Sequence, residues 1–292
     1  MRVAIFGKYI EAEFLNTVKE LFIKLEHYKV EVCIYEPFYN MLKNNYSYTP
    51  NVFNMFTSIK DCSSEIDILF SLGGDGTFLD SVAHVERTNI PIAGINFGRL
   101  GFLANISIPE MSGALEQIVA GKYQVEKRSM LQVESDAKYF APFPFGLNDF
   151  TIQKSGAGLL KINTFINDEY MSTYWTDGLI VATPTGSTAY SLSVGGPIIT
   201  PSLSTFIISA IAPHNLTVRP LVIPDSSTIR FEASGRNGKV LLTIDSRDIV
   251  SDSPIVVTVK KAPFSANVVS LESTAFYKTL RSKLYWGIDK RN

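Results

Sequence analysis

The sequence contains few of the features that mark exported, membrane-spanning or nucleic-acid-binding proteins. Only two of its 292 residues are cysteines, Cys33 and Cys62, and they form no CxxC pair, so no disulfide framework is expected. Charged residues make up 19% of the chain and the formal net charge is -1, which gives no electrostatic reason to expect nucleic acid or an anionic membrane as a partner. No apolar run approaches the roughly 20 residues that span a bilayer, and the first one is too short for a signal peptide. We therefore expect a cytoplasmic protein.

Two further absences narrow the chemistry. The three histidines, His27, His84 and His214, do not have the spacing of metal ligands, so the sequence predicts no protein-built metal site. The chain also lacks a Gly-x-Ser-x-Gly segment, which disfavours a serine hydrolase.

The first part of the chain has the pattern of an α/β domain. Short apolar runs alternate with segments of helical period, which is typical of a parallel sheet covered by helices. We expect strands at residues 3–6, 30–35, 67–72 and 91–96, and helices at residues 13–25, 77–85 and 110–119. Residues 38–56, rich in Asn and Tyr, show no clear period and are expected to form a loop.

The second part has the pattern of antiparallel β structure, with short alternating segments rich in β-branched and aromatic residues. Asn167-Asp168 and Gly235–Gly238 are expected hairpin turns. The predicted fold is an α/β N-terminal domain with a parallel sheet (residues 1–122) and a β-rich, sandwich-like C-terminal domain (123–272). A helix and tail (273–292) are expected to pack back on the N-terminal domain.

A glycine-rich loop follows the strand at 67–72. Gly73-Gly74-Asp75-Gly76-Thr77 precedes a helix, and glycines there let the backbone approach phosphate at a helix N-terminus. A carboxylate at Asp75 would repel phosphate, but it could accept a proton from a hydroxyl that attacks phosphorus. The alternative is a tight turn with Asp75 as helix N-cap. The loop is neither a Walker A sequence nor GxGxxG.

The loop resembles that of a superfamily that includes NAD kinases, diacylglycerol and sphingosine kinases and 6-phosphofructokinases. The loop alone does not choose among them. A second segment, Gly94–Leu103, resembles the GxNxGxLGFL segment that NAD kinases carry after the next strand.

The segment Thr176–Pro197 is similar to the NAD kinase signature over its whole length, with Ala182 where Ser is usual. Its small hydroxyl residues suit hydrogen bonds to adenine and ribose, and the ring of Tyr190 suits stacking on a base. The alternative is a Ser/Thr-rich turn capping a short helix. The resemblance implies that NAD is bound by Asp177, Thr188, Ala189, Tyr190, Ser191, Leu192 and Ser193.

Three further positions depart from the family pattern. Asn148-Asp149 matches an Asn-Glu pair near the adenosine, although a shorter Asp replaces Glu. Trp175 stands where many members have Arg. Asp245-Ser246-Arg247 stands where DGQ or DSQ is common, and the charge of Arg247 could face the pyrophosphate or the new 2′-phosphate. The alternative is an exposed Arg in a hairpin.

The resemblance implies an NAD kinase-like two-domain fold and phosphorylation of the adenosine-ribose 2′-hydroxyl of NAD. Asp75 would be the general base, and Gly73, Gly74 and Gly76 would let the backbone approach the transferred phosphoryl group. ATP or another phosphate donor and Mg²⁺ or another divalent metal are implied, as is a homodimer or homotetramer. Two alternatives are a lipid or sugar-phosphate kinase with the same loop and a catalytically silent NAD(P)-binding sensor.

Overall fold

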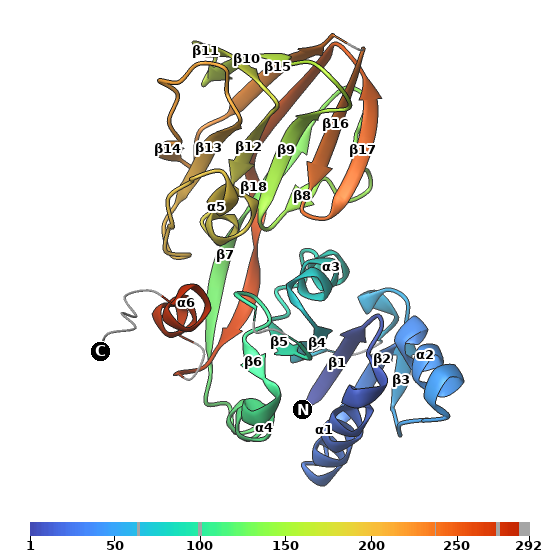
Figure 1. Ribbon diagram of the computed structural model, residues 1–292. Coiled ribbons are helices and arrows are strands. Elements are labelled where there is room, and N and C mark those ends of the chain that lie inside the picture. Colours follow the sequence, from blue (N-terminus) through green and yellow to red (C-terminus); the bar gives the residue numbers. More distant parts are fainter. Residues whose placement is uncertain (63–64, 99–100, 237, 273–274, 286–292) are drawn as a thin grey trace. The chain divides into compact units, whose positions relative to one another are not determined.

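The computed structural model describes residues 1–62, 65–98, 101–236, 238–272 and 275–285 (Figure 1). The chain divides into two compact units, one formed by Met1–Glu126 with Asn267–Asn292 and the other by Lys127–Ala266. Of the segment 273–292, residues 273, 274 and 286–292 lie outside the described part of the chain. No helix in the described ranges is long and apolar enough to cross a bilayer.

The first unit contains a parallel sheet with the order β5-β4-β1-β2-β3. Its elements are β1 (Arg2–Gly7), α1 (Leu15–His27), β2 (Glu31–Tyr35), α2 (Glu36–Tyr46), β3 (Asn54–Phe56), β4 (Ile68–Gly73), α3 (Asp75–Val85), β5 (Ile92–Asn96), β6 (Ile106–Ser107), α4 (Met111–Val119) and α6 (Phe276–Leu284). The strands are almost wholly buried, which explains why they read as continuous apolar runs. From β1 the chain adds β2 and β3 on one side and then returns to add β4 and β5 on the other side. In such a sheet, ligands usually bind at the carboxyl ends of the two strands where the order switches, here β1 and β4.

The predicted loop at 38–56 was wrong. Residues 36–46 form α2, and residues 54–56 form the edge strand β3. Pro37 lies in the first turn of the helix, where its missing N–H costs nothing, and Phe38 and Leu42, one turn apart, are fully buried. Most Asn residues of the segment are exposed, and its Tyr residues pack only partly buried against the core, so the short apolar period is obscured.

The second unit is a sandwich of antiparallel sheets. Its elements are β7 (Gln124–Glu134), which begins in the first unit, β8 (Phe145–Gly146), β9 (Asp149–Lys154), β10 (Leu160–Ile166), β11 (Glu169–Thr176), β12 (Gly178–Ala182), the 3-10 turn η4 (Thr185–Thr188), α5 (Tyr190–Ser193), β13 (Thr205–Ile211), β14 (Leu221–Pro224), β15 (Ile229–Gly235), β16 (Lys239–Ile244), β17 (Arg247–Asp252) and β18 (Ile255–Ser270), which ends in the first unit. One sheet has the order β14-β13-β12-β9-β16-β17, and β11-β10-β15-β18 form the other. Buried side chains of both sheets share one apolar core, as in a sandwich. The predicted fold class is confirmed.

The two expected hairpin turns have different outcomes. Asn167 and Asp168 have φ of 51° and 67° and join the paired strands β10 and β11, so this hairpin is confirmed. The hairpin predicted at Gly235–Gly238 is wrong, because β15 pairs with β10 and β18 whereas β16 pairs with β9 and β17. The strands on either side of this segment therefore belong to different sheets of the sandwich, and residue 237 lies outside the described part of the chain.

Candidate active site

The carboxylate of Asp75 is held by the backbone of a loop more than 25 residues further along the chain. Its Oδ1 accepts the N–H groups of Leu103 and Ala104 at 3.0 and 2.9 Å, and its Oδ2 accepts that of Phe102 at 2.9 Å. Asp75 is the first residue of α3, and the N-cap position is occupied by Gly74, which has no side chain to cap the helix. The reading of Asp75 as an N-cap is therefore wrong.

Two glycines allow this arrangement. A Cβ on Gly101 would lie 1.7 Å from Asp75 Oδ1, so a side chain there would occupy the position of the carboxylate. Gly73 has a φ of 150°, and its Cβ would lie 2.4 Å from Thr77 Oγ1. A Cβ on Gly74 or Gly76 would meet no atom within 4 Å. The exposed backbone of these two residues is thus open to a ligand, whereas Gly73 and Gly101 are required by the packing of the loop itself.

Asn96, at the end of β5, shapes the loop that holds Asp75. Its Oδ1 accepts the N–H of Gly98 at 2.7 Å and its Nδ2 donates to the carbonyl of Ala104 at 3.2 Å. Because both groups of the amide are bonded to the loop, the three N–H donors are fixed in direction. Of the segment Gly94–Leu103, residues 99 and 100 lie outside the described part.

In the second unit, three segments far apart in the sequence meet around Asn148 and Asp149. The carbonyl of Asn148 accepts the N–H of Thr183 at 2.9 Å, and a Cβ on Gly186 would lie 2.0 Å from the same carbonyl oxygen. The carboxylate of Asp245 accepts the N–H groups of Leu147, Asn148 and Asp149 at 3.0, 2.8 and 3.3 Å. The folded sandwich therefore gathers the Asn-Asp pair, the middle of the signature segment and the turn after β16.

The signature segment forms two short turns, η4 and α5. Tyr190 is 38% exposed, which leaves its ring available for stacking, while Ser191 is fully buried with a hydroxyl that has no hydrogen-bond partner among the described residues. The hydroxyls of Ser187 and Thr188 donate to backbone carbonyls within four residues of themselves. Part of the predicted hydroxyl cluster thus serves the turn, and Ser191 is left with an unused donor.

Two charged residues of the predicted site have protein partners. Asp177, between β11 and β12, forms an ion pair with Lys154 Nζ at 2.7 Å. Arg247 donates to the carbonyls of Phe143 and Phe145, and its guanidinium lies 5.1 Å from the centre of the Phe143 ring. The contact expected between Arg247 and a phosphate stays a prediction.

Comparison with known proteins agrees with these features. Residues 3–123 match the ATP-NAD kinase N-terminal domain and residues 147–271 match the ATP-NAD kinase C-terminal domain. The chain belongs to the ATP-NAD kinase family. It is 40% identical to an NAD kinase of Cytophaga hutchinsonii over 293 residues and 41% identical to that of Flavobacterium psychrophilum over 295, covering 100% of each chain.

Solved structures of the family share the fold. A crystal structure of an NAD kinase from Archaeoglobus fulgidus in complex with ATP has 25% sequence identity, a TM-score of 0.74 and coverage of 96% of this chain and 99% of that one. The crystal structure of yeast NADH kinase complexed with NADH gives a TM-score of 0.86 at 23% identity, over 99% of this chain and 89% of that one.

The sequence did not identify several residues that shape the site in this family member. Residues 102–104 contribute backbone N–H groups, which no side-chain pattern reveals. Asp245 and Gly186 lie inside segments that the resemblance covered, but their roles depend on contacts with residues 147–149. Lys154, the partner of Asp177, carried no signal in the sequence.

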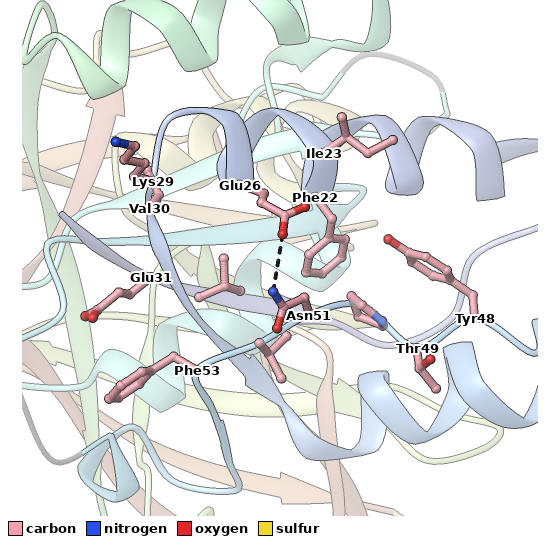
Figure 2. A pocket seen from close by; sticks show the side chains of 13 residues that line it. Phe22, Ile23, Glu26, Lys29, Val30, Glu31, Tyr48, Thr49, Asn51 and Phe53 are labelled. Carbon is pink, nitrogen blue, oxygen red and sulfur yellow. Dashed lines mark hydrogen bonds between the residues drawn. The ribbon is translucent and has the colours of Figure 1, made fainter.

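A separate pocket in the first unit contains none of the predicted site residues. Figure 2 shows the pocket, lined by residues from the end of α1, the start of β2 and the segment 48–53, with a hydrogen bond of 3.3 Å from Asn51 Nδ2 to Glu26 Oε1. Its strand residues lie at the amino end of β2, whereas Asp75 follows the carboxyl end of β4. The strands are parallel, so the pocket and Asp75 belong to opposite edges of the sheet.

Proposed function

We propose that this chain transfers the γ-phosphoryl group of ATP to the 2′-hydroxyl of the adenosine ribose of NAD, with Asp75 as general base. Family membership assigns phosphorylation of NAD to NADP. The observation that carries the role of Asp75 is its fixed carboxylate, which accepts three backbone N–H groups.

The way these hydrogen bonds are shared between the two carboxylate oxygens of Asp75 supports one of them as the proton acceptor. A carboxylate has about four acceptor directions, two on each oxygen. Among the described residues, Oδ1 accepts two N–H groups, those of Leu103 and Ala104, whereas Oδ2 accepts one, that of Phe102. We assign Oδ2 as the atom that accepts the proton of the 2′-hydroxyl.

In the transfer, one bond to the γ-phosphorus forms and one breaks. The 2′-oxygen forms a bond to the γ-phosphorus as the bond from that phosphorus to the β,γ-bridging oxygen breaks, and ADP leaves with the electron pair. The hydroxyl proton passes to Oδ2 of Asp75 and then to solvent. The exposed backbone at Gly74 and Gly76 and the N-terminus of α3 suit the approach of the anionic phosphoryl group.

We assign NAD binding to the residues predicted from the sequence in the second unit. The buried carboxyl of Asp149, the amide of Asn148 and the exposed ring of Tyr190 can together bind a ribose and a base.

A divalent metal and the cellular setting belong to the proposal as well. The described residues contain no group of three His, Cys, Asp or Glu side chains placed to hold a metal ion. A Mg²⁺ carried by ATP phosphates and water fits this donor set, since it needs one or two carboxylates at most, and it would neutralise phosphate charge. Cys33 and Cys62 are free thiols, which is compatible with the cytoplasmic location that we propose. A homodimer or homotetramer stays a prediction.

The test is a coupled assay. Purified protein is incubated with NAD, ATP and Mg²⁺, and NADP is followed with an NADP-specific dehydrogenase. Asp75→Asn should still bind NAD while kcat falls by about 10²–10⁴, the usual contribution of a positioned base.

The matched control is Asp67→Asn, at the other end of the segment that leads through β4. Asp67 accepts the backbone N–H of Arg2 at 2.7 Å and should tolerate the change with kcat retained. Thermal unfolding of both variants checks that the loop at 101–104 remains folded. Full turnover in Asp75→Asn would refute the base, and failure to form NADP with any phosphate donor would refute the phosphoryl transfer.

A further inference from the structure

The turn between β16 and β17 places the carboxylate of Asp245 against Asn148 and Asp149, and Asp245 itself has an unusual backbone conformation. Asp245 has a φ of 52°, in the left-handed region, where Asp, Asn and Gly are the residues best tolerated. Its backbone N–H donates to the carbonyl of Asp149 at 3.0 Å. The turn therefore contacts the start of β9 through both its main chain and its side chain.

The carboxylate of Asp245 bonds three consecutive N–H groups, those of Leu147, Asn148 and Asp149. These N–H groups precede or begin β9, whose ladder with β12 starts where Asp149 pairs with Ala182. Thr183 holds the carbonyls of Leu147 and Asn148, and Asp245 holds the N–H groups. Hydrogen bonds to an ionised acceptor are about twice as strong as neutral ones, so the Asp245 carboxylate fixes the N–H side of this short segment.

We propose that Asp245 is a positioning residue for NAD, because its carboxylate holds the backbone of residues 147–149 and so presents the side chains of Asn148 and Asp149 to the dinucleotide. The inference rests on the proposed assignment of those two residues to NAD. Asp245 would then act on NAD binding through Asn148 and Asp149.

The same contact gives Asp245 an electrostatic effect on Asp149. Burial and the negative charge of Asp245 raise the pKa of Asp149 to about 7. Burial also raises the pKa of Asp245, while its backbone N–H bonds and the charge of Arg247 act in the opposite direction. Asp245 is thus the better-stabilised anion of the pair, and Asp149 holds the proton as pH falls below about 7.

This predicts a pH dependence of NAD binding. An ionised Asp149 accepts hydrogen bonds from ribose hydroxyls, so NAD should bind more tightly as pH rises through about 7. Among the described residues, Asp245 is the charged group that acts on Asp149, and Arg247 acts on Asp245. Removing the charge at residue 245 should move the midpoint of the binding profile to lower pH.

Two substitutions separate the carboxylate from the turn. Asp245→Gly keeps a residue that readily adopts positive φ but removes the side chain. Asp245→Asn keeps positive φ and one acceptor oxygen but removes the charge. Affinity is measured by calorimetry with NAD alone over pH 5.5–8.5, and KM for NAD and for ATP is measured in the coupled assay.

Asp245→Gly should raise the Kd and KM for NAD about tenfold at pH 8, with the KM for ATP unchanged. Asp245→Asn should bind NAD within about threefold of the wild type at pH 8, and its midpoint should lie about one pH unit lower. If Asp245→Gly does not fold, the affinity and pH profile of Asp245→Asn decide the question.

The control is Asp225→Asn, a buried carboxylate of the same unit that accepts Ser129 Oγ at 2.9 Å and pairs with Lys261 Nζ at 2.7 Å. This variant should lower the Tm and leave the Kd for NAD unchanged. An unchanged Kd in Asp245→Gly, an unshifted midpoint in Asp245→Asn, or equal losses of affinity in Asp245→Gly and Asp225→Asn would each overturn the inference. A wild type that binds NAD without forming NADP would instead refute the phosphoryl transfer, since the binding measurements do not depend on turnover.

Discussion

The carboxylates of Asp75 and Asp245 each accept hydrogen bonds from three consecutive backbone N–H groups. Asp75 holds residues 102–104, and Asp245 holds residues 147–149. The short side chain of Asp has few rotamers, so an Asp that is bonded in this way presents its remaining lone pair in one direction. The same interaction orients the proposed base in one case and the proposed NAD-binding pair in the other.

At the residue scale, Gly101 provides a test that leaves Asp75 itself unchanged. A methyl group at residue 101 would lie 1.7 Å from Asp75 Oδ1 and must force the carboxylate away from its N–H donors. Gly101→Ala should lower kcat by at least about 10², while the Kd for NAD stays within about twofold. The coupled assay and calorimetry measure the two quantities.

The control for this variant is Gly113→Ala. Gly113 lies in α4, where a Cβ would meet no atom within 4 Å. Alanine should therefore leave kcat unchanged and stabilise the helix by about 0.5–1 kcal/mol. Wild-type turnover in Gly101→Ala would contradict the proposed role of the Asp75 tether.

At the scale of elements, α2 shows how a short buried face fixes a helix. Phe38 and Leu42 are fully buried, and the Phe38 ring lies so close to Gly7 that a Cβ there would meet it at 2.8 Å. Phe38→Ala should lower the free energy of unfolding by about 3–5 kcal/mol. Urea denaturation measures this, and exposed Lys43→Ala on the same helix should stay within about 0.5 kcal/mol of the wild type. Equal stability of the two variants would show that α2 contributes no core packing.

At the scale of the whole molecule, each unit has a core of its own. Leu271 and Val269 belong to the core of the first unit, whereas Val257 belongs to that of the second. Leu271→Ala should speed amide exchange in β1, β4 and β5, and Val257→Ala should speed it in β9 and β12, because local stability follows the core that is damaged. Hydrogen exchange followed by mass spectrometry resolves these segments. Loss of protection in both units from either change would contradict separate cores.

Long periodic segments were predictable from the sequence, and short ones were not. The helix α1 and the strands β1, β2, β4 and β5 of the first sheet were predicted within a few residues, because their apolar periods are uninterrupted. The helix α2 was missed because only two of its residues are buried. The turn at Gly235–Gly238 was misassigned because the local sequence does not determine which sheet a following strand joins.

A strand, a GGDGT loop and a long dinucleotide signature are local patterns, so the sequence predicts the family, the fold class and the residue types expected at the site. The bonds from Asp75 to residues 102–104 and from Asp245 to residues 147–149 depend on the folded chain. These bonds end on backbone N–H groups, which every residue except proline carries. A pattern of side chains therefore cannot predict these hydrogen bonds, because each carboxylate reaches its loop only in the folded chain.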